Sequence, residues 1–200
     1  MLVTLDTVCA LTMRAVPELG TPAHVRLTTL IESAQELVRV YLNVGRLENE
    51  AQTPQTVQAY GGDYKAVIIR EYIRAVSEVK IGALSIPNSD YFLSPPNPVR
   101  RDRQGLPIWT GVELFREMPF GRNEELLTIT GVFGFTQANC PLAIQNAIAR
   151  TVQHLYHLAN VNETMLSSST AGTSASLKAQ VEALPPSVID QLRSWRIPSV

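Results

Sequence analysis

The sequence predicts an α+β protein with a helical bundle core, an inserted antiparallel β-sheet and an extended C-terminal tail. Two long stretches, 22–43 and 141–161, carry apolar residues at the spacing of amphipathic helices. The stretch between them, 57–135, is rich in β-branched and aromatic residues that alternate with polar ones, as in half-buried strands. The chain then ends in a short segment with its own apolar residues, which follows a run of small residues.

Bulk composition limits the classes to which the protein can belong. Its 200 residues are 45% hydrophobic and 18% charged, which suffices to bury one sizeable core, so we expect a single globular domain. The formal net charge of -1 gives no general attraction to nucleic acid or to an anionic membrane, so any contact with DNA must be local. Cys9 and Cys140 are too few for a disulfide scaffold and fit a chain that folds in a reducing cytoplasm.

The first half of the helical region contains two predicted helices. A short helix is expected over 5–15. The next, over 22–43, begins with the capping residue Thr21 and has Pro22 in its first turn. Its buried stripe is expected to consist of Val25, Leu27, Leu30, Ile31, Ala34, Leu37, Val38 and Tyr41.

The second long helix, over 141–161, follows the β-rich region. Pro141 lies in its first turn. Its apolar stripe is expected to consist of Ile144, Ala147, Ile148, Thr151, Val152, Leu155, Tyr156 and Ala159.

The β-rich region 57–135 should form an antiparallel sheet of about three to five strands. The clearest alternation places one set of side chains on the same face: Ile73, Ala75, Ser77, Val79 and Ile81. The stretch 87–107 contains several prolines, which cannot enter a central strand, so it predicts a long exposed loop, with a short edge strand as an alternative for part of it.

The C-terminal part is predicted to be a linker followed by a docking tail. The small-residue run Ser167–Ser176 cannot bury enough apolar surface to hold itself in place. We therefore divide the chain into a domain over 1–166 and a linker with its tail over 167–200. The apolar side chains of the tail lie at helical spacing: Val188, Ile189, Leu192 and Trp195.

No sequence motif predicts an enzyme. We find no nucleophile elbow, phosphate-binding loop, His-Glu-x-x-His zinc motif or dinucleotide fingerprint. His154 and His157 lie on one helix face but have no further ligand at a suitable spacing, so we interpret them as ordinary surface or interface histidines. Glu124 and Glu125 are neighbours in a polar turn, where solvation explains them. We expect no catalytic residue, cofactor or metal.

A membrane location is not expected. The uncharged stretch Leu126–Ala149 is long enough to cross a bilayer, but its polar side chains would remain unsatisfied in hydrocarbon. The N-terminus has Asp6 where a secretory signal would have a basic residue, so we expect a protein that is not exported.

The basic cluster of Arg100, Arg101 and Arg103 is the first candidate contact surface. Arginines on a loop could bind a phosphate backbone or an acidic partner, with Asp102 partly offsetting their charge. A solvated loop tip that keeps a sheet edge soluble is the alternative, and the sequence leaves both open.

The tail is the second candidate surface. Trp195, Arg193 and Arg196 are residue types enriched at the energetic centres of protein interfaces. The tail could equally fold back onto its own domain, and composition does not choose between the two.

The order of these elements resembles the head-to-tail adaptor family of tailed bacteriophages. The resemblance covers most of the chain: TLDTV opens the first helix, ELVRVYLNVGR ends the second, and LLTITGVFGFTQANCP leads into LAIQNAIARTVQHLYHLA. The loose motif of a strand, an aromatic-glycine turn and a proline-initiated helix is matched by Thr130, Gly131, Phe133, Gly134, Phe135, Pro141, Ile144 and Ala147. The proline-rich insertion and the small-residue run depart from a minimal member of the family.

The resemblance implies a structural virion protein of the neck region, assembled in the host cytoplasm. Subunits would form a homo-oligomeric ring, typically a dodecamer, that binds the portal protein on one side and neck or tail-completion proteins on the other. DNA would pass through the ring without sequence-specific binding. The resemblance assigns portal binding to the tail, which offers Val188, Ile189, Leu192, Arg193, Trp195, Arg196, Ile197 and Pro198. A small DNA- or protein-binding regulatory module that uses the arginine-containing loop is the alternative function.

Overall fold

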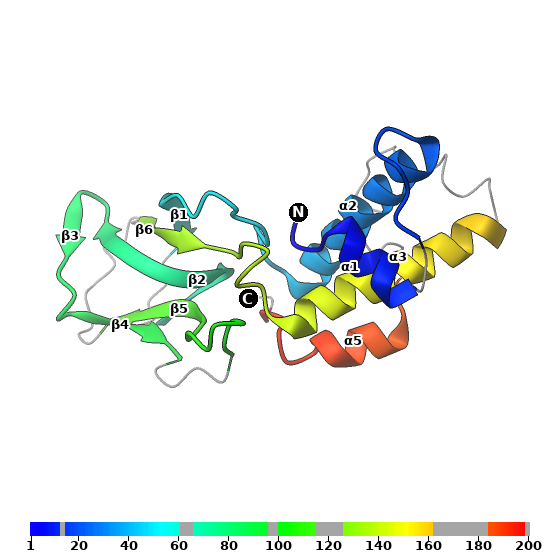
Figure 1. Cartoon of the computed structure of the whole chain (residues 1–200). Helices are drawn as coiled ribbons and strands as arrows, with labels where there is room; N and C mark the ends of the chain where they lie inside the picture. Colours follow the sequence, from blue (N-terminus) through cyan, green and yellow to red (C-terminus); the bar gives the residue numbers. More distant parts are fainter. Residues whose placement is uncertain (13–14, 61–65, 96–99, 115–125, 162–183, 199–200) are drawn as a thin grey trace. The chain divides into compact units, whose positions relative to one another are not determined.

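A computed structural model describes residues 1–12, 15–60, 66–95, 100–114, 126–161 and 184–198 (Figure 1). The chain separates into two compact units. The first, which we call the helical unit, contains Met1–Asn43 and Cys140–Arg196. The second, the sheet unit, contains Val44–Asn139 together with Ile197–Val200.

The described part of the helical unit contains two long and two short helices. They are α1 (Leu5–Thr12), α2 (Pro22–Leu42), α3 (Leu142–Val161) and α5 (Pro186–Leu192). The long helices α2 and α3 pack against each other, and both α1 and α5 pack on α3 (Figure 1). The predicted helices over 22–43 and 141–161 are therefore present within one residue of the expected bounds.

Local sequence signals fix the ends of α2. The hydroxyl of Thr21 accepts a hydrogen bond from the His24 N–H at 3.3 Å, and Pro22 occupies the first turn. Asn43 ends the helix in the left-handed conformation at φ 58°. Most of the predicted stripe is buried, as are Leu42 and the following Val44, but Val25 is 56% exposed.

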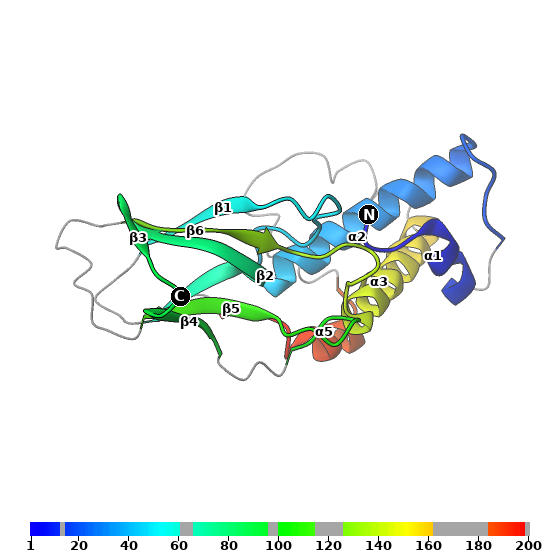
Figure 2. The ribbon, with the colours of Figure 1, turned by 60° about the vertical axis from the view of Figure 1, so that its left-hand side comes forward.

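The sheet unit is a six-stranded antiparallel sheet. Its strands are β1 (Gln55–Tyr60), β2 (Ala66–Ile81), β3 (Leu84–Ile86), β4 (Tyr91–Ser94), β5 (Trp109–Leu114) and β6 (Leu126–Phe133). The strand order is β1-β6-β2-β5-β4, and β3 forms a hairpin with the end of β2. Figure 2 shows β1, β6 and β2 on one side of the unit and β5 with β4 on the other.

The sheet curves around its own hydrophobic core. Side chains from β2 to β6 form one buried cluster, which includes Tyr91 of the edge strand β4 and Phe133 of β6. Val57, from the opposite edge strand β1, packs against the same cluster. The apolar side chains of these strands therefore bury one another within the sheet unit.

The long strand β2 carries register shifts that rotate its side chains. Between Ile73 and Ala75, and again between Val76 and Glu78, β2 advances two residues while β6 advances one. Each extra residue reverses the face to which the following side chains point. The predicted face therefore holds at Ile73, Val79 and Ile81, which are buried. It fails around the two shifts, at Ala75 and Ser77, which are exposed.

Two glycines of β6 and its turn are required by close backbone approach. A Cβ at Gly131 would lie 2.2 Å from the carbonyl oxygen of Ala75, opposite one of the bulges of β2. Gly134 has φ +74°, a conformation that disfavours side chains, and lies against the backbone of Leu47. Phe133 and Phe135, which flank this glycine, are fully buried.

The predicted fold class was wrong about where the core lies. The structure is a mixed α/β protein whose six-stranded antiparallel sheet has its own core, and the described residues form no long helical bundle into which a sheet is inserted. The physical reason is that the apolar residues of the strands bury one another across a curved sheet.

The C-terminal segment is not extended, which is a second correction to the predicted fold. Residues Pro186–Leu192 form α5, and its side chains Val188 and Leu192 are fully buried. The helical unit takes in residues on both sides of position 167. The predicted linker Ser167–Ser176 lies outside the described residues.

Candidate functional site

The arginine cluster lies on a tight loop that leads into β5. Arg101 pairs with Pro107 in an antiparallel bridge, and the Asp102 N–H donates to the carbonyl of Leu106 at 2.9 Å. Gly105 adopts φ +81° and donates its N–H to the carbonyl of Asp102 at 3.1 Å. These backbone bonds give the loop one defined conformation. We call residues 100–107 the arginine loop.

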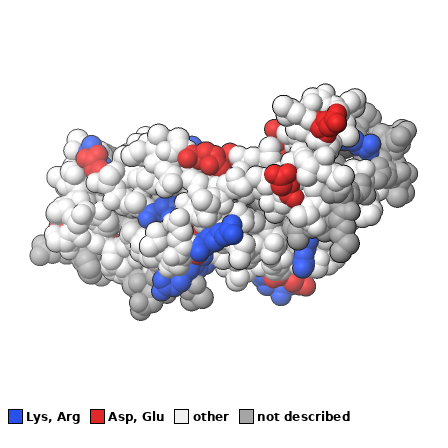
Figure 3. All heavy atoms as spheres, viewed as in Figure 1, with Lys and Arg blue, Asp and Glu red and all other residues white. Residues whose placement is uncertain are grey.

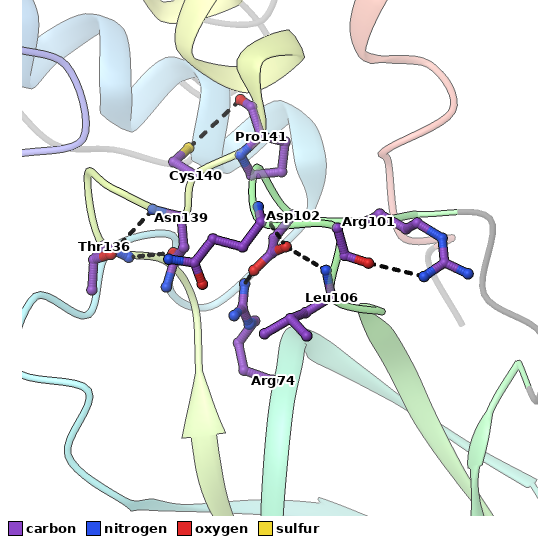
Figure 4. A network of polar contacts seen from close by, with 10 residues as sticks. Arg74, Arg101, Asp102, Leu106, Thr136, Asn139, Cys140 and Pro141 are labelled. Atoms are coloured by element: carbon purple, nitrogen blue, oxygen red, sulfur yellow. Dashed lines mark hydrogen bonds and ion pairs between the residues drawn. The ribbon is translucent and has the colours of Figure 1, made fainter.

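Asp102 holds the arginine loop from the inside (Figure 4). Its side chain has no exposed surface. Its Oδ1 accepts hydrogen bonds from the N–H of Gln104 at 2.9 Å and of Leu106 at 2.6 Å. An aspartate that binds the N–H groups of its own turn is a common way to fix such a turn.

The other carboxylate oxygen of Asp102 pairs with an arginine from β2. Nη1 of Arg74 lies 2.6 Å from Oδ2, and the Arg74 side chain is only 9% exposed (Figure 4). Neither atom meets the geometry of a hydrogen bond, so we describe the contact as a Coulombic pair. The guanidinium carbon of Arg74 lies 5.9 Å from the centre of the Phe135 ring, which gives it a second favourable contact.

A second polar group anchors the base of the loop. The N–H of Arg103 donates to the carbonyl of Asn139 at 3.1 Å. The Asn139 side chain accepts from the N–H of Thr136 at 2.8 Å, and the Thr136 hydroxyl accepts from the N–H of Asn139 at 3.3 Å. The loop is therefore tied both to β2 and to the turn that follows β6.

The three predicted arginines differ in their exposure to solvent. Arg101 and Arg103 are exposed, whereas Arg100 is half-buried. Nη1 of Arg101 donates to the carbonyl of Gly105 at 2.9 Å, which steadies that side chain over the loop. Figure 3 shows several Lys and Arg side chains near one another, with little acidic surface between them in that view.

The expectation that Asp102 partly offsets the positive charge of the loop arginines needs correction. The carboxylate points inward and pairs with Arg74, so its charge serves a contact inside the sheet unit. Arg101 and Arg103 thus present their charge to solvent on a loop whose acidic residue is buried.

The role of Arg74 was not predicted from the sequence. The DRQG sequence of the loop is typical of a turn with an inward-bonding aspartate, so this half of the arrangement had a local signal. Arg74 lies in β2, far away in the sequence, and nothing in its neighbourhood predicts its partner.

The C-terminal tail, the second predicted surface, is divided between buried and exposed side chains. Val188, Leu192 and Ile197 are fully buried. Arg193, Arg196 and Pro198 are exposed, and Ile189 and Trp195 are half-buried.

Polar contacts also hold α5 within the helical unit. The Tyr41 hydroxyl donates to the carbonyl of Ile189 at 3.2 Å, and Nε2 of Gln191 donates to the carbonyl of Ala143 at 2.7 Å. Arg196 stacks over the Tyr41 ring at 5.6 Å. Only the exposed side chains of the tail are thus available to a partner without a change in the helical unit.

Other candidate sites are weaker. His154 is half-buried and His157 is exposed on α3. Within the described ranges, no group of three or more His, Cys, Asp or Glu side chains could hold a metal ion. Glu124 and Glu125 lie outside the described residues.

A hollow of about 460 Å³ in the helical unit is lined by Cys9, Ala15, Pro17, Pro22, Ala23, Arg26, Leu27 and Tyr156. The guanidinium of Arg26 lies 5.7 Å from the centre of the Tyr156 ring. A reactive thiol needs a neighbouring base or cation, and the Arg26 group here stacks on an aromatic ring. The hollow is a weaker candidate than the arginine loop.

None of the helices in the described residues is both long enough and apolar enough to cross a bilayer.

Comparison with other proteins adds no family assignment. No family model matches the chain, and the search of curated proteins gave no match.

Proposed function

We propose that this chain is a structural virion protein, the head-to-tail adaptor of a tailed bacteriophage, which forms a ring between the portal and the neck or tail. Its work would be to bury surface against copies of itself and other virion proteins. The proposal includes no catalytic residue, cofactor or metal.

The observation that carries the proposal is the motif at the end of β6. The residues by which the sequence resembles adaptors include Gly131 and Gly134, where the backbone leaves no room for, or disfavours, a side chain. They also include the fully buried Phe133, Phe135 and Ile144. The resemblance therefore lies in residues that determine the local fold.

Two exposed surfaces support an assembly role. The arginine loop presents Arg101 and Arg103, and the tail presents Arg193, Arg196 and part of Trp195. Arginine and tryptophan are enriched where protein interfaces gain most of their binding energy. In a ring, such modest contacts would add through multivalency, with the portal bound by the exposed part of the tail.

Electron microscopy of the purified chain mixed with portal rings tests the proposal. We expect a second ring, of dodecameric symmetry, on one end of the portal, with an open channel through which DNA can pass. A chain that remains monomeric and leaves the portal undecorated under these conditions would contradict the proposal.

Substitution of the half-buried Trp195 tests the portal contact more finely. Trp195→Ala should weaken binding to portal rings by about 2 kcal/mol or more, the amount typical of an interface hot spot. Arg150→Ala, an exposed change on α3, is the control and should leave binding unchanged. Deletion of the whole tail is a poorer test, because it removes the buried Val188, Leu192 and Ile197.

A second candidate function, a small DNA- or protein-binding regulatory module, is favoured by the fixed arginine loop alone. A salt titration with free duplex DNA separates the two. Two arginine–phosphate contacts, from Arg101 and Arg103, would give a slope of log K against log salt of about −1.8. Strong duplex binding with a slope of that size or steeper would favour the regulatory module over the adaptor.

A further inference from the structure

We infer that the arginine loop is a docking site for an acidic protein segment that also offers an apolar side chain. The source of that segment, a neighbouring component of the particle, rests on the proposed function. The chemistry of the site follows from the loop itself.

The loop is fixed before any partner binds. Its conformation is determined by the two N–H groups bound to Asp102 Oδ1, by the pair with Arg74 and by the bond from the Arg103 N–H to Asn139. A buried ion pair contributes little net stability, because the charges lose their hydration. Its main physical effect here is to hold one loop conformation, which lowers the entropy lost on binding.

In this fixed conformation the side chains of the loop differ in whether they point inward or are exposed. Asp102 points inward, and its neighbours Arg101 and Arg103 are exposed on either side of it. The guanidinium of Arg101 is steadied by the carbonyl of Gly105, which engages one of its nitrogens. Guanidinium groups held in this way suit carboxylates, which they can bind through two parallel hydrogen bonds.

An apolar residue beside the arginines favours a protein partner over nucleic acid. Leu106 is 51% exposed at the same loop. A partner that covers Leu106 gains from burial of apolar surface, which a phosphate backbone cannot provide. With two arginine–phosphate contacts the loop would bind DNA only weakly, with a slope of log K against log salt of about −1.8.

Amide chemical-shift mapping on the full-length chain tests the inference. The probe is a synthetic, end-capped peptide of sequence Glu-Leu-Glu-Glu-Leu-Glu, and a short DNA duplex is titrated in parallel. The peptide should shift the amides of Arg101 to Leu106. Arg101→Gln/Arg103→Gln should weaken its binding at least about ten-fold, through loss of the charge-assisted hydrogen bonds.

Matched variants separate recognition from folding. Arg70→Gln removes an exposed arginine of β2 and should leave peptide binding unchanged. Leu106→Ser should weaken binding several-fold through loss of the apolar contact, and unchanged binding would overturn the apolar part of the inference. Arg74→Met should weaken binding although the exposed arginines remain, whereas Arg74→Lys, which keeps the charge opposite Asp102, should restore most of it.

The outcomes are decisive for the loop. Peptide binding that is absent, that shifts amides elsewhere, or that survives loss of both exposed arginines would overturn the inference. Loop shifts with the duplex but not with the peptide would overturn it in favour of a phosphate site. Portal rings decorated equally by the wild type and by Arg101→Gln/Arg103→Gln would leave the adaptor function standing and remove only the role of the loop in assembly.

Discussion

The two units of this protein differ in how far their structure follows from local sequence. In α2, nearly every residue of the apolar stripe expected from helical spacing is buried, and Thr21 caps the helix as its position predicts. In β2, the expected alternation is interrupted by two register shifts, which leave Ala75 and Ser77 exposed.

The difference arises from where the hydrogen bonds of each element lie. A helix forms its backbone hydrogen bonds within itself, so the periodicity of its apolar residues determines which face is buried. The facing of a strand depends on the register it shares with neighbours, and one extra residue reverses it. The sheet unit should therefore be more sensitive than the helical unit to changes at contacts that are distant in sequence.

Removal of a core aromatic should give the largest effect and tests whether the units are independent. Phe133→Ala should lower the free energy of unfolding by about 3–5 kcal/mol, and Ile31→Ala in α2 by about 2–5 kcal/mol. Each unit contains one of the two tryptophans, Trp109 in the sheet unit and Trp195 in the helical unit.

Fluorescence in urea, with the other tryptophan replaced by Phe, reports on each unit separately. Phe133→Ala should shift the Trp109 transition more than the Trp195 transition, and Ile31→Ala should do the reverse. Equal shifts of both transitions would break the comparison, because they would mean that the two units unfold as one.

Loss of Asp102 compares a long-range contact with a local one. Asp102→Ala leaves the guanidinium of Arg74 buried without its partner, which should cost about 3 kcal/mol or more. Thr21→Ala, which removes only a local helix cap, should cost about 1 kcal/mol. Denaturant unfolding measures both, and a cost for Asp102→Ala no larger than for Thr21→Ala would show that Arg74 is not left as a buried, uncompensated charge.

A methyl group at Gly131 probes the register of the sheet. Gly131→Ala places a carbon against the backbone of Ala75 and should cost about 2–3 kcal/mol through overpacking. Gly82→Ala is the control: its φ is +56° but no atom lies within 4 Å, so about 1 kcal/mol is expected. Thermal unfolding distinguishes them, and equal losses would argue against a close approach of β6 to β2.

The smallest expected effect is a pH-dependent contact on α2. Hydrogen bonds from Arg39 lower the pKa of Glu36 below its usual value of 4.5, so the contribution of this pair is present above about pH 4.5 and is lost as pH falls through the lowered pKa. Because Glu36 is exposed, the contribution should be only about 0.3–0.5 kcal/mol. A double-mutant cycle of Glu36→Gln and Arg39→Gln should show this coupling at pH 7 but not at pH 2, and a coupling that persists at pH 2 would refute the assignment.

The sequence by itself determined the helices and the extent of the sheet. The expected helices over 22–43 and 141–161 correspond to Pro22–Leu42 and Leu142–Val161, and the expected β-rich region over 57–135 nearly spans the strands from β1 to β6. The arginine loop was also recognisable as exposed and turn-forming. These features follow from periodicity, caps and turn residues, which act over a few positions of the chain.

Only the tertiary structure decided where the core lies, how β2 pairs and which side chains of the candidate surfaces remain exposed. Arg74 and Asp102 meet although 27 residues separate them, and α5 buries Val188 and Leu192 in place of an extended tail. Contacts of this kind depend on packing among distant segments, and the amino acids at each position are compatible with several partners. The choice between those partners is made by the free energy of the whole fold, which no short stretch of sequence contains.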